Sequence, residues 1–163
     1  ATPEHFWDRN APKYAKSKIG DMPAYEATLD RIRHYLEPHH RMLEFACGTG
    51  STALILRDHV KHIIGTDISG EMQRIATTKA ADAGATNVEF RKAGALTSSQ
   101  MAIDVVFGSS ILHLLPGWPD NIRKLREHVK PGGLFITKTP CLKHANILIR
   151  GIIPVMRLVG YAP

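Results

Sequence analysis

A glycine turn at the end of an apolar segment is the part of this sequence best suited to hold a ligand. Residues 43–50 run from apolar side chains into a turn that contains Gly48 and Gly50, and a helical pattern follows. Glycine permits a tight turn and the close approach of a ligand to the backbone, and the start of the helix offers free N–H groups. Gly48, Gly50 and Ala53 match the spacing G-x-G-x-x-A. Asp67, at the end of the next expected strand, fits the acidic residue that binds ribose hydroxyls in dinucleotide sites.

Glu44 bears on which cofactor such a turn would bind. It is a carboxylate within the expected strand and close to the glycines. A pyrophosphate at the turn would be repelled by this carboxylate, and the repulsion grows in a crevice of low dielectric constant. S-adenosylmethionine has no phosphate, and it presents an ammonium group and a sulfonium at that end, so an anion there is favourable. The alternative is that Glu44 is a structural carboxylate paired with a nearby lysine or arginine.

The elements that must position these residues alternate along the chain. A helix is expected over 23–37, because Tyr25, Leu29 and Ile32 recur on one face. Strands are expected at 42–46, 62–66, 88–91, 103–107 and 134–139. Further helices are expected at 52–59, from an N-cap at Ser69 to about Ala83, and at 119–129. Residues 1–20 are expected to form an irregular leading segment.

Strands that alternate with helices at this spacing indicate parallel βαβ units. With right-handed crossovers they predict an α/β fold: a doubly wound, mostly parallel sheet with helices on both faces, as in Rossmann-like proteins. We expect one domain overall, with an N-terminal lid segment and helix over 1–40 and the cofactor-binding part over 41–163. Residues 95–103 are short for a crossover, and we expect the C-terminal part to be truncated.

Composition and charge disfavour several classes of protein. The 163 residues are 44% hydrophobic and 22% charged, which is typical of a packed globular domain. The net charge of +6 is compatible with nucleic acid, but the basic residues are scattered without an aromatic-rich binding pattern. Cys47 and Cys141 form no disulfide or metal pattern, and residues 1–10 hold no apolar signal core, so we expect a cytoplasmic protein. The apolar segment 147–159 is too short to span a bilayer.

Together these motifs resemble those of the class I S-adenosylmethionine-dependent methyltransferases, of the small-molecule type. Residues 43–50 are similar to the glycine motif of that family, and residues 65–69 to the motif whose acid holds both ribose hydroxyls. Residues 103–113 resemble the fourth-strand motif, whose end faces the transferred methyl group. The resemblance implies S-adenosylmethionine as cofactor and the following cofactor-binding residues: Glu44, Ala46, Cys47, Gly48, Thr49, Gly50, Asp67, Ile68, Met72, Gly94, Ala95 and Ser109.

Two positions depart from the pattern of the family. Ala46 stands where the family usually has glycine, and we expect the small side chain to be tolerated provided that the local φ is negative. Gly94 stands where the family often has an aspartate that accepts a hydrogen bond from the adenine amino group. Losing one such bond costs about 0.5–1.5 kcal/mol. Backbone groups and apolar contacts are therefore expected to hold the adenine.

The reaction implied by the resemblance is an in-line displacement, in which an acceptor attacks the sulfonium methyl and S-adenosylhomocysteine leaves. A general base is needed only if the acceptor must lose a proton. His113 is the candidate base, because it follows the fourth strand at the carboxyl edge of the sheet. Its alternative role is packing against Leu114 and Trp118. Tyr14, and less so His5, is a candidate catalytic or lid residue over the cofactor, with core packing as the alternative.

Other functions stay open at this point. One is an NAD(P)-binding Rossmann oxidoreductase, which Glu44 disfavours; another is a non-catalytic S-adenosylmethionine-binding domain. Among methyltransferases, a small-molecule acceptor is favoured over nucleic acid, because residues 108–111 lack the Asn/Asp-Pro-Pro-aromatic tetrapeptide of amino-directed enzymes. No metal site is expected, since the histidines at 39–40 and at 59 and 62 lack further ligands at a telling spacing. Residues 147–159 are a candidate lining for a hydrophobic acceptor pocket.

Overall fold

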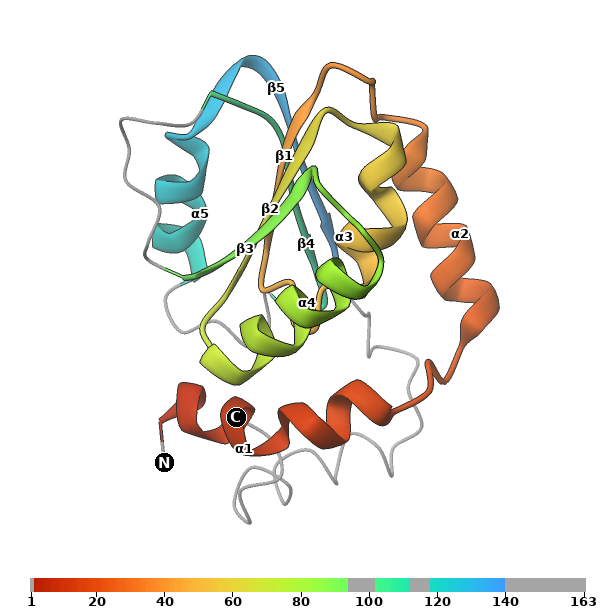
Figure 1. Ribbon diagram of the computed structural model, residues 1–163. Helices are drawn as coiled ribbons and strands as arrows, with labels where there is room; N and C mark the ends of the chain where they lie inside the picture. The colour runs from red at the N-terminus through yellow and green to blue at the C-terminus, as the bar shows by residue number, and fades with distance from the viewer. Residues whose placement is uncertain (1, 94–101, 112–117, 140–163) are drawn as a thin grey trace, which may run out of the picture.

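The structure is a computed structural model that describes residues 2–93, 102–111 and 118–139 (Figure 1). The helices are α1 (Pro3–Lys16), α2 (Met22–Arg33), α3 (Ser51–Leu56), α4 (Gly70–Asp82) and α5 (Trp118–Arg126), with a short 3-10 helix η1 (Arg57–His59) after α3. The strands are β1 (Arg41–Phe45), β2 (His62–Asp67), β3 (Val88–Lys92), β4 (Ile103–Ser109) and β5 (Val129–Lys138).

The described strands form one sheet in the order β3-β2-β1-β4-β5, and every neighbouring pair is parallel. Leu43 of β1 lies in register with Ile64 on one side and Val106 on the other. The chain therefore adds β2 and β3 on one side of β1, and then β4 and β5 on the other side. The predicted α/β doubly wound sheet is confirmed, and ligands of such sheets bind where the strand order reverses, at the carboxyl ends of the strands.

Helices cover both faces of the sheet, as Figure 1 shows. Side chains that alternate along each strand divide between two cores, because successive residues of a strand point to opposite faces. Met42 and Ile63 pack with residues of α2 and α3 in one core, whereas Leu43 and Ile64 pack with Leu125 of α5 in the other. Glu44 is two residues from Met42, so it shares the face of α2 and α3.

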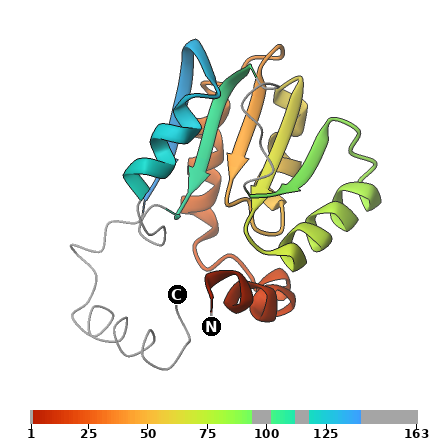
Figure 2. The ribbon, with the colours of Figure 1, turned by 90° about the vertical axis from the view of Figure 1, so that its left-hand side faces the viewer.

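The expectation of an irregular segment over 1–20 is wrong, because most of these residues form helix α1. Thr2 caps this helix by accepting a hydrogen bond from the backbone N–H of His5 at 3.3 Å, and Pro3 occupies its first turn, where its missing N–H has no cost. Pro12, inside the helix, does not end it. Figures 1 and 2 show α1 lying across the carboxyl ends of the strands, beside α4.

The boundary between α5 and β5 also differs from the expectation. The helix ends at Arg126, and the strand already begins at Val129, which pairs with Ile103. The pairing then shifts register, and Gly132 within the shifted part has φ +80°. The Pro-Gly-Gly sequence at 131–133 is thus an irregularity within the strand and not a turn before it. None of the helices in the described ranges is long and apolar enough to cross a membrane.

Candidate active site

The glycine turn follows β1 and is held by backbone hydrogen bonds. The N–H of Cys47 donates to the carbonyl of Thr66 at 2.9 Å, and the N–H of Gly50 donates to the carbonyl of Cys47 at 3.0 Å. Gly48 has φ +54° and Gly50 has φ +73°, a left-handed conformation that glycine adopts without a steric cost. The turn places the start of α3 at the carboxyl edge of the sheet.

Ala46 has φ +52°, so the condition on which its tolerance was expected, a negative φ, is not met. An L-residue in the left-handed region costs about 1–2 kcal/mol, because its Cβ crowds the following carbonyl. Strain of this kind persists only where the surrounding structure enforces it, and it is common at ligand sites. Here the hydrogen bond of the next residue, Cys47, to β2 holds the backbone in place.

Close packing beneath the turn explains a second requirement for glycine. A Cβ at Gly50 would lie 2.4 Å from the ring of Phe90 and 3.0 Å from Cβ of Ala76. A Cβ at Gly65 would lie 2.6 Å from the same ring. Phe90 of β3 therefore supports the turn from below, and neither glycine can be replaced without displacing it.

Asp67 ends β2 and accepts two backbone hydrogen bonds. The N–H of Gly48 donates to its Oδ2 and the N–H of Ser69 donates to its Oδ1, each at 2.9 Å. Burial raises the pKa of this carboxyl group, and the two amides oppose that effect by favouring the ionised form. Ile68, the next residue, is exposed at the same edge. The predicted acid and the predicted glycine turn are thus in direct contact.

Glu44 is buried on β1, and its Oε2 has no hydrogen-bond partner among the described residues. Burial, together with the charge of Asp67, raises the pKa of Glu44 to about 8, and the backbone amide of Ala53 opposes that rise. In the described part of the chain no lysine or arginine pairs with it. A buried carboxylate oxygen without a partner suits a cationic group of a ligand.

Tyr25 and Thr52 lie near Glu44 and were not identified as site residues from the sequence. The hydroxyls of Tyr25 on α2 and Thr52 on α3 are 3.0 Å apart. Burial raises the pKa of Tyr25, and the charge of Glu44 adds to that rise. In the sequence Tyr25 is only one member of the apolar face of a helix, and no local signal distinguishes it.

The remaining predicted residues divide between the edge of the sheet and its interior. Ser109 ends β4, the strand next to β1, and Tyr14 of α1 places its ring 3.7 Å from where a Cβ of Gly48 would stand. Met72, in the first turn of α4, is buried. Cys47 is also buried, which raises the pKa of its thiol and makes it a poor nucleophile. The predicted residues His113, Gly94 and Ala95, and the segment 147–159, lie outside the described residues.

Thr49 shows a further contact that sequence reasoning missed. Its carbonyl accepts a 3.0 Å hydrogen bond from Nζ of Lys79 on α4, and Nζ also donates to the hydroxyl of Ser51 at 2.7 Å. Burial lowers the pKa of Lys79. The ammonium group therefore braces the glycine turn from the side of α4. Within the described ranges no cluster of three histidine, cysteine or acidic side chains is placed to bind a metal ion.

Comparisons with known proteins find methyltransferases. Residues 17–155 match a family described as a methyltransferase domain. The uncharacterized methyltransferase YcgJ of Bacillus subtilis is 28% identical over 99 residues, which are 60% of this chain and 39% of that protein. Trans-aconitate 2-methyltransferase of Deinococcus radiodurans is 26% identical over 105 residues, 63% of this chain and 39% of that protein.

A solved structure of a DhpI–SAM–HEP complex superposes with a TM-score of 0.67 at 25% identity, over 91% of this chain and 68% of that one. The chain spans 39% of the length of each of the two curated relatives. The family match covers more than half of this chain, and its residues 17–155 include β1, the glycine turn and Asp67. The chain belongs to the methyltransferase domain family.

Proposed function

We propose that this chain binds S-adenosylmethionine at the glycine turn and transfers its methyl group to a small-molecule acceptor. The observation that carries the proposal is Oε2 of Glu44, which is buried beside the turn and has no hydrogen-bond partner in residues 2–93, 102–111 and 118–139. A dinucleotide would bring a pyrophosphate toward this carboxylate, whereas S-adenosylmethionine brings an ammonium group. Membership of the methyltransferase domain family and the likeness to a complex that contains SAM support the same cofactor.

The residues at the carboxyl edge fit this cofactor part by part. Glu44 would bind the ammonium group, and backbone groups of the turn from Ala46 to Gly50 would lie under the methionine part. Asp67 would accept hydrogen bonds from the ribose hydroxyls through oxygens that already hold two backbone amides. Ile68, exposed beside it, would cover the adenine.

When bound, S-adenosylmethionine supplies an electrophilic methyl group on a positively charged sulfur. The protein then has to orient the acceptor and exclude water, which together supply much of the catalysis in a displacement of this kind. We assign Tyr14 to the exclusion of water, because its ring covers Gly48. His113 stays our candidate for the general base, for an acceptor that must lose a proton.

The acceptor is proposed to be a small molecule, as the name of trans-aconitate 2-methyltransferase indicates for that relative. The N-terminal part, 1–40, is proposed as the lid, since α1 lies across the edge where the cofactor would bind (Figure 2). A cytoplasmic location is also proposed, because the buried Cys47 is a free thiol, as is usual in that compartment.

Isothermal titration with S-adenosylmethionine, S-adenosylhomocysteine and NADH tests the proposal. We expect the first two to bind and NADH not to bind. Glu44→Gln keeps the shape of the side chain and removes its charge, so it should weaken both ligands by roughly tenfold or more, the value of a hydrogen bond to a charged group. Glu37→Gln, a change at an exposed glutamate, is the matched control and should bind as the wild type does.

Two results would count against this function. Binding of NADH alone would favour an oxidoreductase on the same fold. Tight binding of S-adenosylmethionine with no methyl transfer to any acceptor in a panel of carboxylates, amines and phenols would favour a non-catalytic binding domain.

A further inference from the structure

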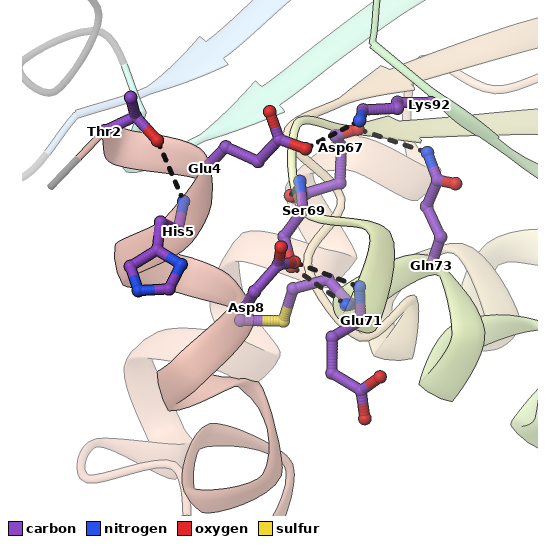
Figure 3. Close-up of polar contacts among 10 residues, drawn as sticks. Thr2, Glu4, His5, Asp8, Asp67, Ser69, Glu71, Gln73 and Lys92 are labelled. Carbon is purple, nitrogen blue, oxygen red and sulfur yellow. Dashed lines mark hydrogen bonds and ion pairs between the residues drawn. The ribbon is translucent and has the colours of Figure 1, made fainter.

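Helix α1 is fastened to the start of α4 by one carboxylate. Oδ1 of Asp8 accepts a hydrogen bond of 2.6 Å from the hydroxyl of Ser69 and one of 3.1 Å from the backbone N–H of Glu71. Figure 3 shows Asp8 pointing from α1 toward these two donors. The first turn of a helix has N–H groups without intrahelical partners and a partial positive charge, so a carboxylate from another element is favourable there.

Ser69 connects this contact to the candidate cofactor site. Its hydroxyl accepts from the backbone N–H of Met72 at 3.0 Å, which caps α4, while it donates to Asp8. Its backbone N–H donates to Oδ1 of Asp67 at 2.9 Å. Ser69 is completely buried, at 0% exposure, so its polar groups bond to these protein partners and not to water. One buried residue thus joins α1 to the acid of β2.

The groups around Asp8 keep it ionised near neutral pH. The hydrogen bonds from Ser69 and from the N–H of Glu71 hold the pKa of Asp8 below its ordinary value, and the charges of Lys92 and His5 act in the same direction. The second polar contact of α1, between Glu4 and Lys92 at 2.6 Å, involves side chains that are 41% and 53% exposed. Exposed ion pairs contribute little, so Asp8 is the stronger attachment.

The same helix carries Tyr14, whose ring lies against the glycine turn. Trp7 packs edge to face on Tyr14 with ring centroids 6.3 Å apart, so the two aromatic residues lie on one side of α1. An attachment at Asp8 therefore fixes the position of the loop at 67–69 and the position of the Tyr14 ring over Gly48.

We propose that Asp8 is a positioning residue for the cofactor: it latches α1 onto Ser69, and so holds Asp67 in its binding orientation and Tyr14 over the glycine turn. The inference rests on the proposed function, because it takes Asp67 and the turn as the cofactor site. It goes further in that it makes the release of the cofactor depend on a contact outside the site. Without the latch, α1 moves away from the edge more often and a bound cofactor escapes faster.

The latch itself is tested without any cofactor, by hydrogen exchange of the backbone amides. Asp8→Ala should increase exchange in α1 and in the first turn of α4 by about tenfold, the effect of losing a hydrogen bond to a charged group. Asp8→Asn keeps one acceptor oxygen and should recover most of the protection. Glu4→Gln, which alters only the exposed pair with Lys92, is the matched control and should exchange as the wild type does.

Its effect on the site is tested by surface plasmon resonance with S-adenosylhomocysteine. Asp8→Ala should raise the dissociation rate about tenfold, with a smaller change for Asp8→Asn and none for Glu4→Gln. Ser69→Ala removes the hydroxyl that donates to Asp8 and also the cap of α4, so the double variant Asp8→Ala/Ser69→Ala should raise the dissociation rate by less than the product of the two single effects.

The outcomes separate the two proposals. Unchanged hydrogen exchange in Asp8→Ala, or a dissociation rate equal to that of the wild type despite faster exchange, overturns the latch while leaving the cofactor site intact. No binding of S-adenosylhomocysteine by the wild-type chain overturns the proposed function, and with it the positioning role of Asp8, even where the exchange data show that the contact exists.

Discussion

The backbone N–H of Gly48 donates a hydrogen bond of 2.9 Å to Oδ2 of Asp67, across the ends of the neighbouring strands β1 and β2. The glycine turn and the acid at the end of β2, 19 residues apart in sequence, are therefore joined by a direct hydrogen bond. The carboxylate holds the turn in shape before any ligand is considered. Its contributions to stability and to binding must be measured separately, because one substitution changes both.

Asp67→Asn is predicted to lower stability as well as cofactor affinity. Asparagine offers a single acceptor oxygen, so its amide group faces the N–H of either Gly48 or Ser69, and that donor loses its partner. Leaving a buried donor unsatisfied costs about 1–3 kcal/mol, and urea denaturation should show this loss. Binding of S-adenosylhomocysteine, measured by calorimetry, should weaken by roughly tenfold or more. Asp82→Asn, at an exposed position near the end of α4, is the control. Unchanged stability would show that Asp67 serves the ligand alone.

The stability of the protein is predicted to depend on pH through Glu44. The pKa of this group rises from 4.5 to about 8 on folding. Between those two values the folded chain holds a proton that the unfolded chain has released, so the free energy of unfolding decreases as the pH rises through this window. Glu44→Gln removes the titration. Its stability relative to the wild type should therefore increase with pH by up to a few kcal/mol, at about 1.4 kcal/mol for each pKa unit.

Cofactor affinity is predicted to change in the opposite direction over the same window. An ammonium group pairs with the ionised form of Glu44, so binding to the wild type must release the proton and becomes tighter as the pH rises from about 5 to about 7. In Glu44→Gln the affinity should be flat over that range. Calorimetry in two buffers of different ionisation enthalpy measures the released proton directly. A wild-type affinity as flat as that of the variant would refute the pairing.

Much of the fold follows from local patterns in the sequence. Met42 and Leu43, like Ile63 and Ile64, are consecutive apolar residues, which indicates strands buried on both faces. The structure divides these residues between two cores. Ser69 was predicted as the N-cap of a helix, and its hydroxyl does accept from the N–H of Met72. Features of this kind depend on neighbours in sequence, and for that reason they can be predicted.

The features that were missed depend on contacts between distant segments. Asp8 has no local pattern that marks it, since its partners Ser69 and Glu71 lie more than 60 residues away. Lys79 and Tyr25 look like ordinary residues of amphipathic helices until α3 and the turn are packed against them. The left-handed conformation of Ala46 was missed for the same reason, because it is imposed by pairing with β2 and not by the alanine itself.

Ala46→Gly is predicted to stabilise the protein slightly. At φ +52° the alanine carries a steric cost of about 1–2 kcal/mol, while glycine carries a greater entropic cost of about 0.5–1 kcal/mol. The net gain should be between about 0 and about 1.5 kcal/mol in the free energy of unfolding. Ala53→Gly, in α3 and completely buried, is the comparison and should destabilise the protein, because glycine weakens a helix. A loss of stability in Ala46→Gly would mean that the methyl group packs usefully despite the strain.

Lys79→Met is predicted to weaken the cofactor site from a distance. The methionine keeps the apolar stem of the side chain, but it cannot donate to the carbonyl of Thr49 or to the hydroxyl of Ser51. The turn then loses its brace from α4, and we expect the affinity for S-adenosylhomocysteine to decrease by roughly tenfold, as for a lost hydrogen bond from a charged donor.

Lys61→Met, at an exposed position before β2, is the control for the loss of one positive charge, and it should bind as the wild type does. Lys79→Arg keeps the charge and should recover part of the affinity, because its guanidinium can still donate to one of the two oxygens. Denaturation curves distinguish bracing from general support of the fold. If the two Lys79 variants lose stability while binding S-adenosylhomocysteine normally, the contact supports α4 alone and the glycine turn keeps its shape without it.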